Sequence, residues 1–239
     1  MAQSLTVILD PGHGGSDPGA IGASGTPEKA YNLETALLAS ALLQQAGIGV
    51  VLTRSSDETV SLEQRLSYQP SGDLWISIHH NASPNHQARG TETFLNPEMS
   101  RRYSGPLPPP ETLAREVQGR VVRAIRTANR GVRYRQDLYL LNRLAIPAVL
   151  VEVCFIDHPD DEAKVLSESG RLRVAYALVG AIGAYAGVSV PQPFPWASVA
   201  LVVAAAGGLW YGWRVILPKL ERMGAVQTPQ RPSPGPASA

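Results

Sequence analysis

Four side chains of the sequence are candidates for joint chemistry: His13, Glu28, His79 and Glu152. His13 lies in a glycine-rich loop, ILDPGHGGSDPGAIG (residues 8–22), where glycine supplies backbone shapes that other residues resist. His79 ends the apolar run LWISIHH, and Glu28 lies in the first turn of a predicted helix. Two histidines and one glutamate, with the fourth position open, are a known ligand set for catalytic zinc.

Glu152 stands among aliphatic residues in the run PAVLVEVCF, residues 147–155. A carboxylate in so apolar a strand is costly unless it has a partner or a chemical role. Each candidate also has a structural interpretation: His13 as a loop residue, Glu28 as a favourable acid at a helix N-terminus, His79 as a core histidine and Glu152 as a paired acid. No local ligand motif such as HExxH is present, so residue types and spacing leave both interpretations open.

The elements that must position these residues alternate along residues 1–186. Strands are predicted at 5–9, 49–54, 74–80 and 147–155, with two less apolar candidates at 90–95 and 137–141. Helices are predicted at about 27–46, 61–68, 111–128 and 160–186. This alternation predicts a single α/β domain with a central twisted, mostly parallel sheet flanked by helices. At the carboxyl edge of such a sheet, both histidines could reach one point.

Composition narrows the classes of function. The net charge of +1 over 239 residues gives no concentrated basic surface, so nucleic acid is not an expected partner. Arg130, Arg133 and Arg135 are expected to form a solvated face or to meet an anionic ligand. Cys154 is the single cysteine, which excludes an intrachain disulfide and a cysteine-based zinc cluster.

The sequence changes character after residue 186. Residues 187–195 form a predicted Pro-rich linker, and residues 196–217 an apolar helix that spans or lies on a membrane. Residues 218–239 are expected to be a disordered tail. The basic residues after the apolar segment favour a cytoplasmic tail, which would put the first domain outside. The N-terminus does not have the features of a secretory signal.

Six segments resemble one family when they are taken in order: ILDPGHGGSDPGAIG, EKAYNLETALLASALL, VVLTRSSD, SLEQR, DLWISIHHNAS and PAVLVEVCFIDHPDDEAKVL. Together they resemble the zinc-dependent N-acetylmuramoyl-L-alanine amidases over residues 5 to about 186. The resemblance implies one Zn²⁺ per chain, held by His13, Glu28 and His79, with Glu152 as the catalytic acid. It also implies a peptidoglycan substrate, cut at the amide between N-acetylmuramic acid and L-alanine.

Three positions raise questions within this resemblance. His80 follows the implied ligand and is expected to be a wall residue of the site, with a swap of the two adjacent histidines as the alternative. Cys154 stands where the family commonly has glycine and is expected to be a packing residue rather than a nucleophile. Asp157 stands near a usual asparagine.

Other functions and places of action remain open from the sequence. The alternatives are a zinc peptidase acting on stem peptides and a non-catalytic wall-binding module on the same fold. The expected location is the cell envelope, membrane-associated with the catalytic domain facing peptidoglycan. A phage-type lysin, made in the cytoplasm and released at lysis, is the alternative. The sequence predicts no oligomeric state.

Overall fold

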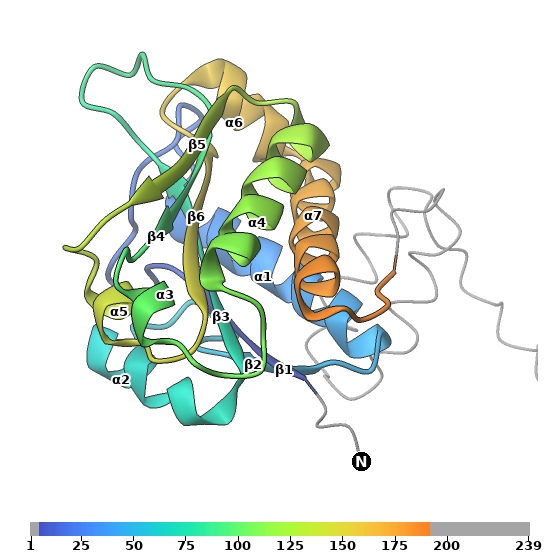
Figure 1. The fold of residues 1–239 in the computed structure, drawn as a ribbon. Coiled ribbons are helices and arrows are strands. Elements are labelled where there is room, and N and C mark those ends of the chain that lie inside the picture. The colour runs from blue at the N-terminus through green and yellow to red at the C-terminus, as the bar shows by residue number, and fades with distance from the viewer. Residues whose placement is uncertain (1–4, 192–239) are drawn as a thin grey trace, which may run out of the picture. The chain divides into compact units, whose positions relative to one another are not determined.

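A computed structural model describes residues 5–191 of the chain. Its six strands form one sheet in the order β2-β1-β3-β6-β4-β5 (Figure 1). The strands are β1 (Thr6–Pro11), β2 (Gly49–Leu52), β3 (Leu74–Asn81), β4 (Thr91–Leu95), β5 (Asn129–Tyr134) and β6 (Ala148–Phe155). Neighbouring strands are parallel except for β4 and β6, which are antiparallel. The predicted mostly parallel α/β sheet is therefore confirmed.

Two long helices, α1 (Glu28–Gln45) and α4 (Pro110–Ile125), pack against the sheet, and a third, α7 (Glu168–Ala186), packs against both of them. The shorter helices are α2 (Leu62–Ser67), α3 (Met99–Arg102), α5 (Tyr139–Arg143) and α6 (Pro159–Leu166), and a 3₁₀ turn covers Gln69–Ser71. The central strands β3 and β6 are largely buried, as strands covered on both faces are: β6 is apolar except for Glu152, and β3 is apolar up to Ile78 except for Ser77. The carboxyl ends of β1, β3 and β6 consequently share one edge of the sheet.

Two predictions about the elements are wrong. Residues 137–141 are not a strand, because α5 begins at Tyr139. The strand in this part of the chain is β5, which lies earlier, at 129–134. The predicted helix 160–186 is two helices, because Ser167 ends α6 and caps α7 through a hydrogen bond from the Gly170 backbone N–H.

The sequence predicts that the apolar segment at 196–217 spans or lies on a membrane. Within residues 5–191, no helix is both long enough and apolar enough to cross a bilayer. The predicted apolar helix at 196–217, the predicted tail at 218–239 and the end of the predicted linker lie outside the described residues. Helix α7 ends at Ala186, and Gly187 takes the left-handed conformation that favours glycine after a helix.

Candidate metal centre and active site

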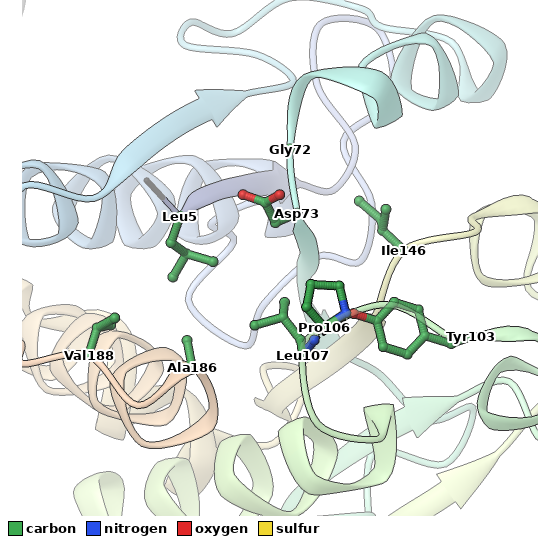
Figure 2. Close-up of a pocket in the computed structure, with 9 residues that line it drawn as sticks. All are labelled: Leu5, Gly72, Asp73, Tyr103, Pro106, Leu107, Ile146, Ala186 and Val188. Atoms are coloured by element: carbon green, nitrogen blue, oxygen red, sulfur yellow. Dashed lines mark hydrogen bonds between the residues drawn. The ribbon is translucent and has the colours of Figure 1, made fainter. Parts of the chain in front are cut away.

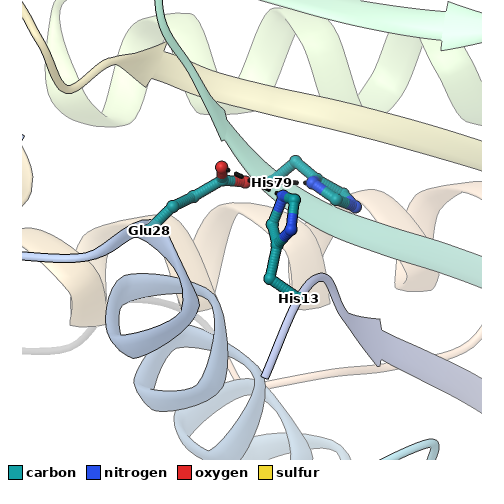
Figure 3. Close-up of side chains that lie close together, drawn as sticks. All are labelled: His13, Glu28 and His79. Atoms are coloured by element: carbon teal, nitrogen blue, oxygen red, sulfur yellow. Dashed lines mark hydrogen bonds and ion pairs between the residues drawn. The ribbon is translucent and has the colours of Figure 1, made fainter. Parts of the chain in front are cut away.

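Three of the predicted site residues converge at the carboxyl edge of the sheet (Figure 3). His13 comes from the loop after β1, Glu28 is the first residue of α1, and His79 lies near the end of β3. One donor atom from each side chain lies within 4.8 Å of the other two, which is close enough for one metal ion to contact all three. We call these residues the His–Glu–His cluster.

The buried carboxylate of Glu28 is the centre of the cluster. Its Oε2 lies 3.1 Å from His13 Nε2, and its Oε1 lies 2.9 Å from His79 Nδ1. The backbone N–H groups of Ala20 and His80 also donate to it. The two imidazole rings meet edge to face, with centroids 4.9 Å apart. The carboxylate is therefore fixed between the two histidines.

A strained backbone aims His13 at the cluster. His13 has a φ of 61°, a left-handed conformation that is uncommon for residues with a side chain. Arg65 donates to the carbonyl of His13 at 2.7 Å, and Arg54 donates to the carbonyl of Gly12 at 2.9 Å. Both arginines are buried, and both also donate to the carbonyl of Pro11. The loop is thus held in its strained shape by hydrogen bonds from two guanidinium groups.

Gly12 makes room for the second histidine. A Cβ at this position would lie 2.1 Å from His79 Cε1 and 2.2 Å from Nε2, so any side chain there would displace the ring. The outer nitrogen of His13 has its own partner, because Nδ1 lies 2.8 Å from Asp17 Oδ2. Carboxylates in this position orient ligand histidines in metal sites.

The adjacent residues His79 and His80 have different partners in the structure. His79 belongs to the cluster, whereas the buried His80 faces α1, where its Nδ1 lies 2.8 Å from Asn32 Oδ1. The ring of Tyr31 lies 5.4 Å from the ring of His80. Burial lowers the pKa of His80 to about 3, so this imidazole is neutral.

Glu152 lies directly beside the cluster. Its register partner on β3 is His79 and its register partner on β4 is Glu92. Its Oε2 is buried and has no hydrogen-bond partner among the described residues. Burial raises the pKa of Glu152 to about 7, which is the range expected of a general acid or base working near neutral pH.

The cluster is electrostatically polarised. Burial opposes the charged form of His13, but its contacts with Glu28 and Asp17 outweigh burial and raise its pKa to about 9. The pKa of His79 is also raised, because the contact with Glu28 outweighs burial. Against the cost of burial, the two histidines hold the pKa of Glu28 well below its usual value. Without a metal, the cluster therefore favours protonated imidazoles beside an ionised Glu28 carboxylate.

Cys154 is fully buried, and burial raises the pKa of its thiol well above the usual value. A buried, protonated thiol has the properties expected of a packing residue. Asp157 is also buried and accepts hydrogen bonds from the Ser83 backbone N–H and the His86 ring. Neither residue belongs to the cluster.

A separate cavity of about 300 Å³ lies away from this site (Figure 2). It is bordered by Leu5 before β1, Asp73 before β3, Ile146 before β6 and the residues that end α7. These positions mark the amino edge of the parallel strands, opposite the edge that carries the cluster. None of the four predicted site residues lines this cavity.

Sequence reasoning missed the residues that support the site. Asp17, Asn32, Arg54, Arg65 and Glu92 all contact the cluster, its loop or the strand beside Glu152. The contact of Asp17 with His13 could have been predicted from sequence, since Asp17 lies four residues after His13 in the same glycine-rich loop. The two arginines carried no such local signal: each donates to backbone carbonyls of the loop, and the one buried carboxylate that Arg65 pairs with, Asp10, lies 55 positions away in the sequence.

An α/β domain that gathers two histidines and a glutamate at the carboxyl edge of its sheet can hold a metal ion there. Comparison with known proteins identifies the family. The family model described as N-acetylmuramoyl-L-alanine amidase matches residues 7–184, and the chain belongs to this family.

Individual relatives agree with this assignment. The probable cell wall amidase LytH of Staphylococcus epidermidis is 36% identical over 187 residues, which are 77% of this chain and 59% of that protein. The N-acetylmuramoyl-L-alanine amidase LytC of Bacillus subtilis is 33% identical over 175 residues, covering 72% of this chain and 34% of LytC. The chain therefore spans less than two thirds of the length of each of these two relatives.

A solved structure shows the same fold. The catalytic domain of CwlV, an N-acetylmuramoyl-L-alanine amidase from Bacillus (Paenibacillus) polymyxa, superposes with a TM-score of 0.70 at 31% identity. The match covers 77% of this chain and 99% of that domain. The described part of the chain thus corresponds to a whole catalytic domain of the family.

Proposed function

We propose that the chain hydrolyses peptidoglycan at the amide bond between N-acetylmuramic acid and L-alanine. The observation that carries the proposal is the His–Glu–His cluster, with Glu152 in register with His79 on the next strand. Membership of the amidase family and the likeness to an amidase catalytic domain support it.

The cluster is proposed to hold one Zn²⁺ through His13, Glu28 and His79. Two imidazole nitrogens and one carboxylate oxygen fit the preferences of this ion, and the close approach of three donors already fixes their relative positions. When bound, the ion supplies a Lewis acid that acidifies water and polarises a carbonyl oxygen. Asp17 is proposed to keep the His13 ring oriented for this role.

Glu152 is proposed as the group that moves the proton. As a carboxylate it takes a proton from the attacking water, and as an acid it delivers that proton to the nitrogen of the leaving L-alanine. Its raised pKa suits both halves of this cycle, because either protonation state is accessible near neutral pH. The buried, unpartnered Oε2 is the oxygen free to accept the proton.

The test is digestion of purified peptidoglycan by the full chain, with and without a chelator, followed by mass spectrometry of the soluble products. The expected result is the release of peptides with a free L-alanine amino group, abolished by the chelator and restored by zinc. Cleavage within the peptides would show the zinc peptidase instead. Wall binding without any product would show a non-catalytic module.

For the place of action, we propose the cell envelope, with the apolar segment 196–217 as a membrane attachment. The cell wall amidases among the relatives support the first part, and the uncharged run at 196–213 within the segment supports the second. In a vesicle flotation assay, the full chain is expected to float with lipid. The double variant Val202→Glu, Leu209→Glu is expected to remain at the bottom, and equal flotation of both proteins would refute the attachment.

A further inference from the structure

We propose that Arg130 and Arg133 on β5 form a subsite that binds a carboxylate of the substrate's peptide. The inference rests on the proposed function and assigns a recognition role to residues outside the His–Glu–His cluster. The sequence allows two interpretations of these arginines, a solvated face and an anion contact, and the sheet register favours the second.

The register places a row of functional side chains across the sheet. His79 on β3 pairs with Glu152 on β6, and Glu152 pairs with Glu92 on β4. Register partners on neighbouring strands project to the same face. On β5, Arg133 pairs with Phe94, two residues along β4 from Glu92 and therefore on the same face, and its Nε lies 3.7 Å from Glu92 Oε2. The row thus runs from the cluster to the arginines on a single face.

A local irregularity of β5 directs Arg130 to the same carboxylate. The pairing of β4 with β5 shifts from Thr91–Asn129 to Glu92–Gly131, which leaves Arg130 as the extra residue of a bulge. Gly131 has a φ of 83°, a conformation suited to glycine in such bulges. Arg130 Nε donates to Glu92 Oε2 at 2.9 Å. Bulges beside active sites commonly re-aim a side chain, and this one brings a second guanidinium to Glu92.

Arg133 is only weakly engaged by Glu92. The carboxylate of Glu92 is 9% exposed and also accepts a hydrogen bond from Asn81, so it is already fully engaged. It faces two guanidinium groups, that of Arg130 at 2.9 Å and that of Arg133 at 3.7 Å. The Arg133 side chain is 52% exposed, and its only ion-pair contact among the described residues is the long one to Glu92. Its two terminal nitrogens can therefore take a carboxylate in bidentate fashion.

The chemistry of the substrate indicates which part this subsite would receive. Once the lactyl carboxyl of N-acetylmuramic acid is in the amide bond, the glycan offers hydroxyl and acetamido groups but no carboxylate. Carboxylates lie on the peptide. Strand β5 is two strand spacings from β6, roughly 10 Å, and an extended peptide covers this distance in about three residues. The subsite therefore fits an acidic group on the second or third residue of the peptide.

The test compares two soluble probes: an N-acetylmuramoyl tripeptide with free carboxyl groups, and the same compound with those groups amidated. Binding is measured by calorimetry on the full chain in chelator, so that no turnover occurs, and hydrolysis is measured separately on the zinc-loaded chain. Arg133→Gln is the test variant. Arg101→Gln on α3, at the far end of β4, removes the same charge from an exposed position and is the matched control.

The parent and the Arg101→Gln control are expected to prefer the free acid by about tenfold, in binding and in kcat/KM. In Arg133→Gln this preference disappears through a higher Kd and KM for the acid, while kcat and the values for the amidated probe stay unchanged. Equal binding of both probes by the parent, or an equal loss for both probes in Arg133→Gln, would overturn the subsite. Acid preference in binding without hydrolysis of either probe would keep the subsite and refute the amidase function.

Discussion

His79 on β3 and Glu152 on β6 are register partners on neighbouring parallel strands. The pairing sets an imidazole of the His–Glu–His cluster and a buried carboxylate oxygen side by side on one face of the sheet. Glu152 is not among the donors that converge in the cluster. The two residues can therefore be separated experimentally, one through metal binding and the other through proton transfer.

Glu152→Gln is expected to retain zinc and to lose turnover by about 10²- to 10⁴-fold, because an amide cannot take the proton of the attacking water. Zinc content and the rate of peptide release are the measurements. Glu116→Gln, on α4 and paired with Arg120, is the control and should keep the parent rate. If Glu152→Gln cleaves as fast as the control, the role assigned to Glu152 is wrong.

Asp17→Asn is expected to weaken zinc binding by about 10- to 100-fold, the usual effect of losing a carboxylate that orients a ligand histidine. Asp17 is 59% exposed, so the fold should be unaffected. Affinity is measured by competition with a chromogenic chelator. Asp160→Asn removes an exposed carboxylate that pairs with Arg89 instead and should leave the affinity unchanged. Equal affinities for the two variants would contradict the orienting role.

Gly12→Ala is expected to abolish tight zinc binding, because the new Cβ would occupy the space of the His79 ring. Gly119→Ala on α4 is the matched control. There the nearest atom is 3.2 Å away, at the end of the flexible Arg123 side chain, and alanine should stabilise the helix by about 0.5–1 kcal/mol. Chelator competition and urea unfolding measure both effects. Parent-like affinity in Gly12→Ala would mean that His79 does not need its observed position.

The metal-free protein is expected to lose stability as the pH rises from 6.5 to 9. The pKa of His13 is raised from 6.5 to about 9 in the folded state, so its stabilising contribution is complete below 6.5 and is lost as the pH passes through the higher value. The loss should be on the order of 2 kcal/mol, after allowance for the partial exposure of the ring.

Urea unfolding in chelator, at pH 6 and pH 9, measures this dependence. His13→Gln should flatten it, since a neutral amide binds no proton in either state. Zinc competes with that proton, so the parent's zinc affinity should rise over the same pH range. A His13→Gln variant with the parent's full pH dependence would show that another group is responsible.

The sequence predicted the central strands and the site for the same physical reason. Strands such as LWISI and PAVLV are continuous apolar runs because both faces are buried, and a polar residue at their ends is conspicuous. The edge strand β5 escaped prediction because it is half exposed and rich in arginine, asparagine and glycine. Its pairing with β4, rather than the pattern of its own side chains, makes it a strand.

The break between α6 and α7 and the support of His13 depend on tertiary structure. Gly170 lies so close to the carbonyl of Lys164 that a Cβ would be 2.1 Å from it, a proximity that helical periodicity does not reveal. Arg54 and Arg65 hold backbone carbonyls of a loop that is distant in the sequence, and the buried ion pair of Arg65 with Asp10 also joins distant segments, so no local pattern indicates their roles. The candidate ligands were predictable, whereas the groups that orient them were not.

The position of β6 between β3 and β4 has a consequence for the nascent chain. The residues of the His–Glu–His cluster belong to β1, α1 and β3, which leave the ribosome early, whereas Glu152 belongs to the last strand to be synthesised. Strand β6 lies between β3 and β4, which precede it in the chain, so the row of side chains is complete only after β6 has paired with both. On the proposed mechanism, a chain without β6 already has the three donors for a metal but lacks the group that moves the proton. Cleavage of the wall therefore begins only after β6 has joined the sheet.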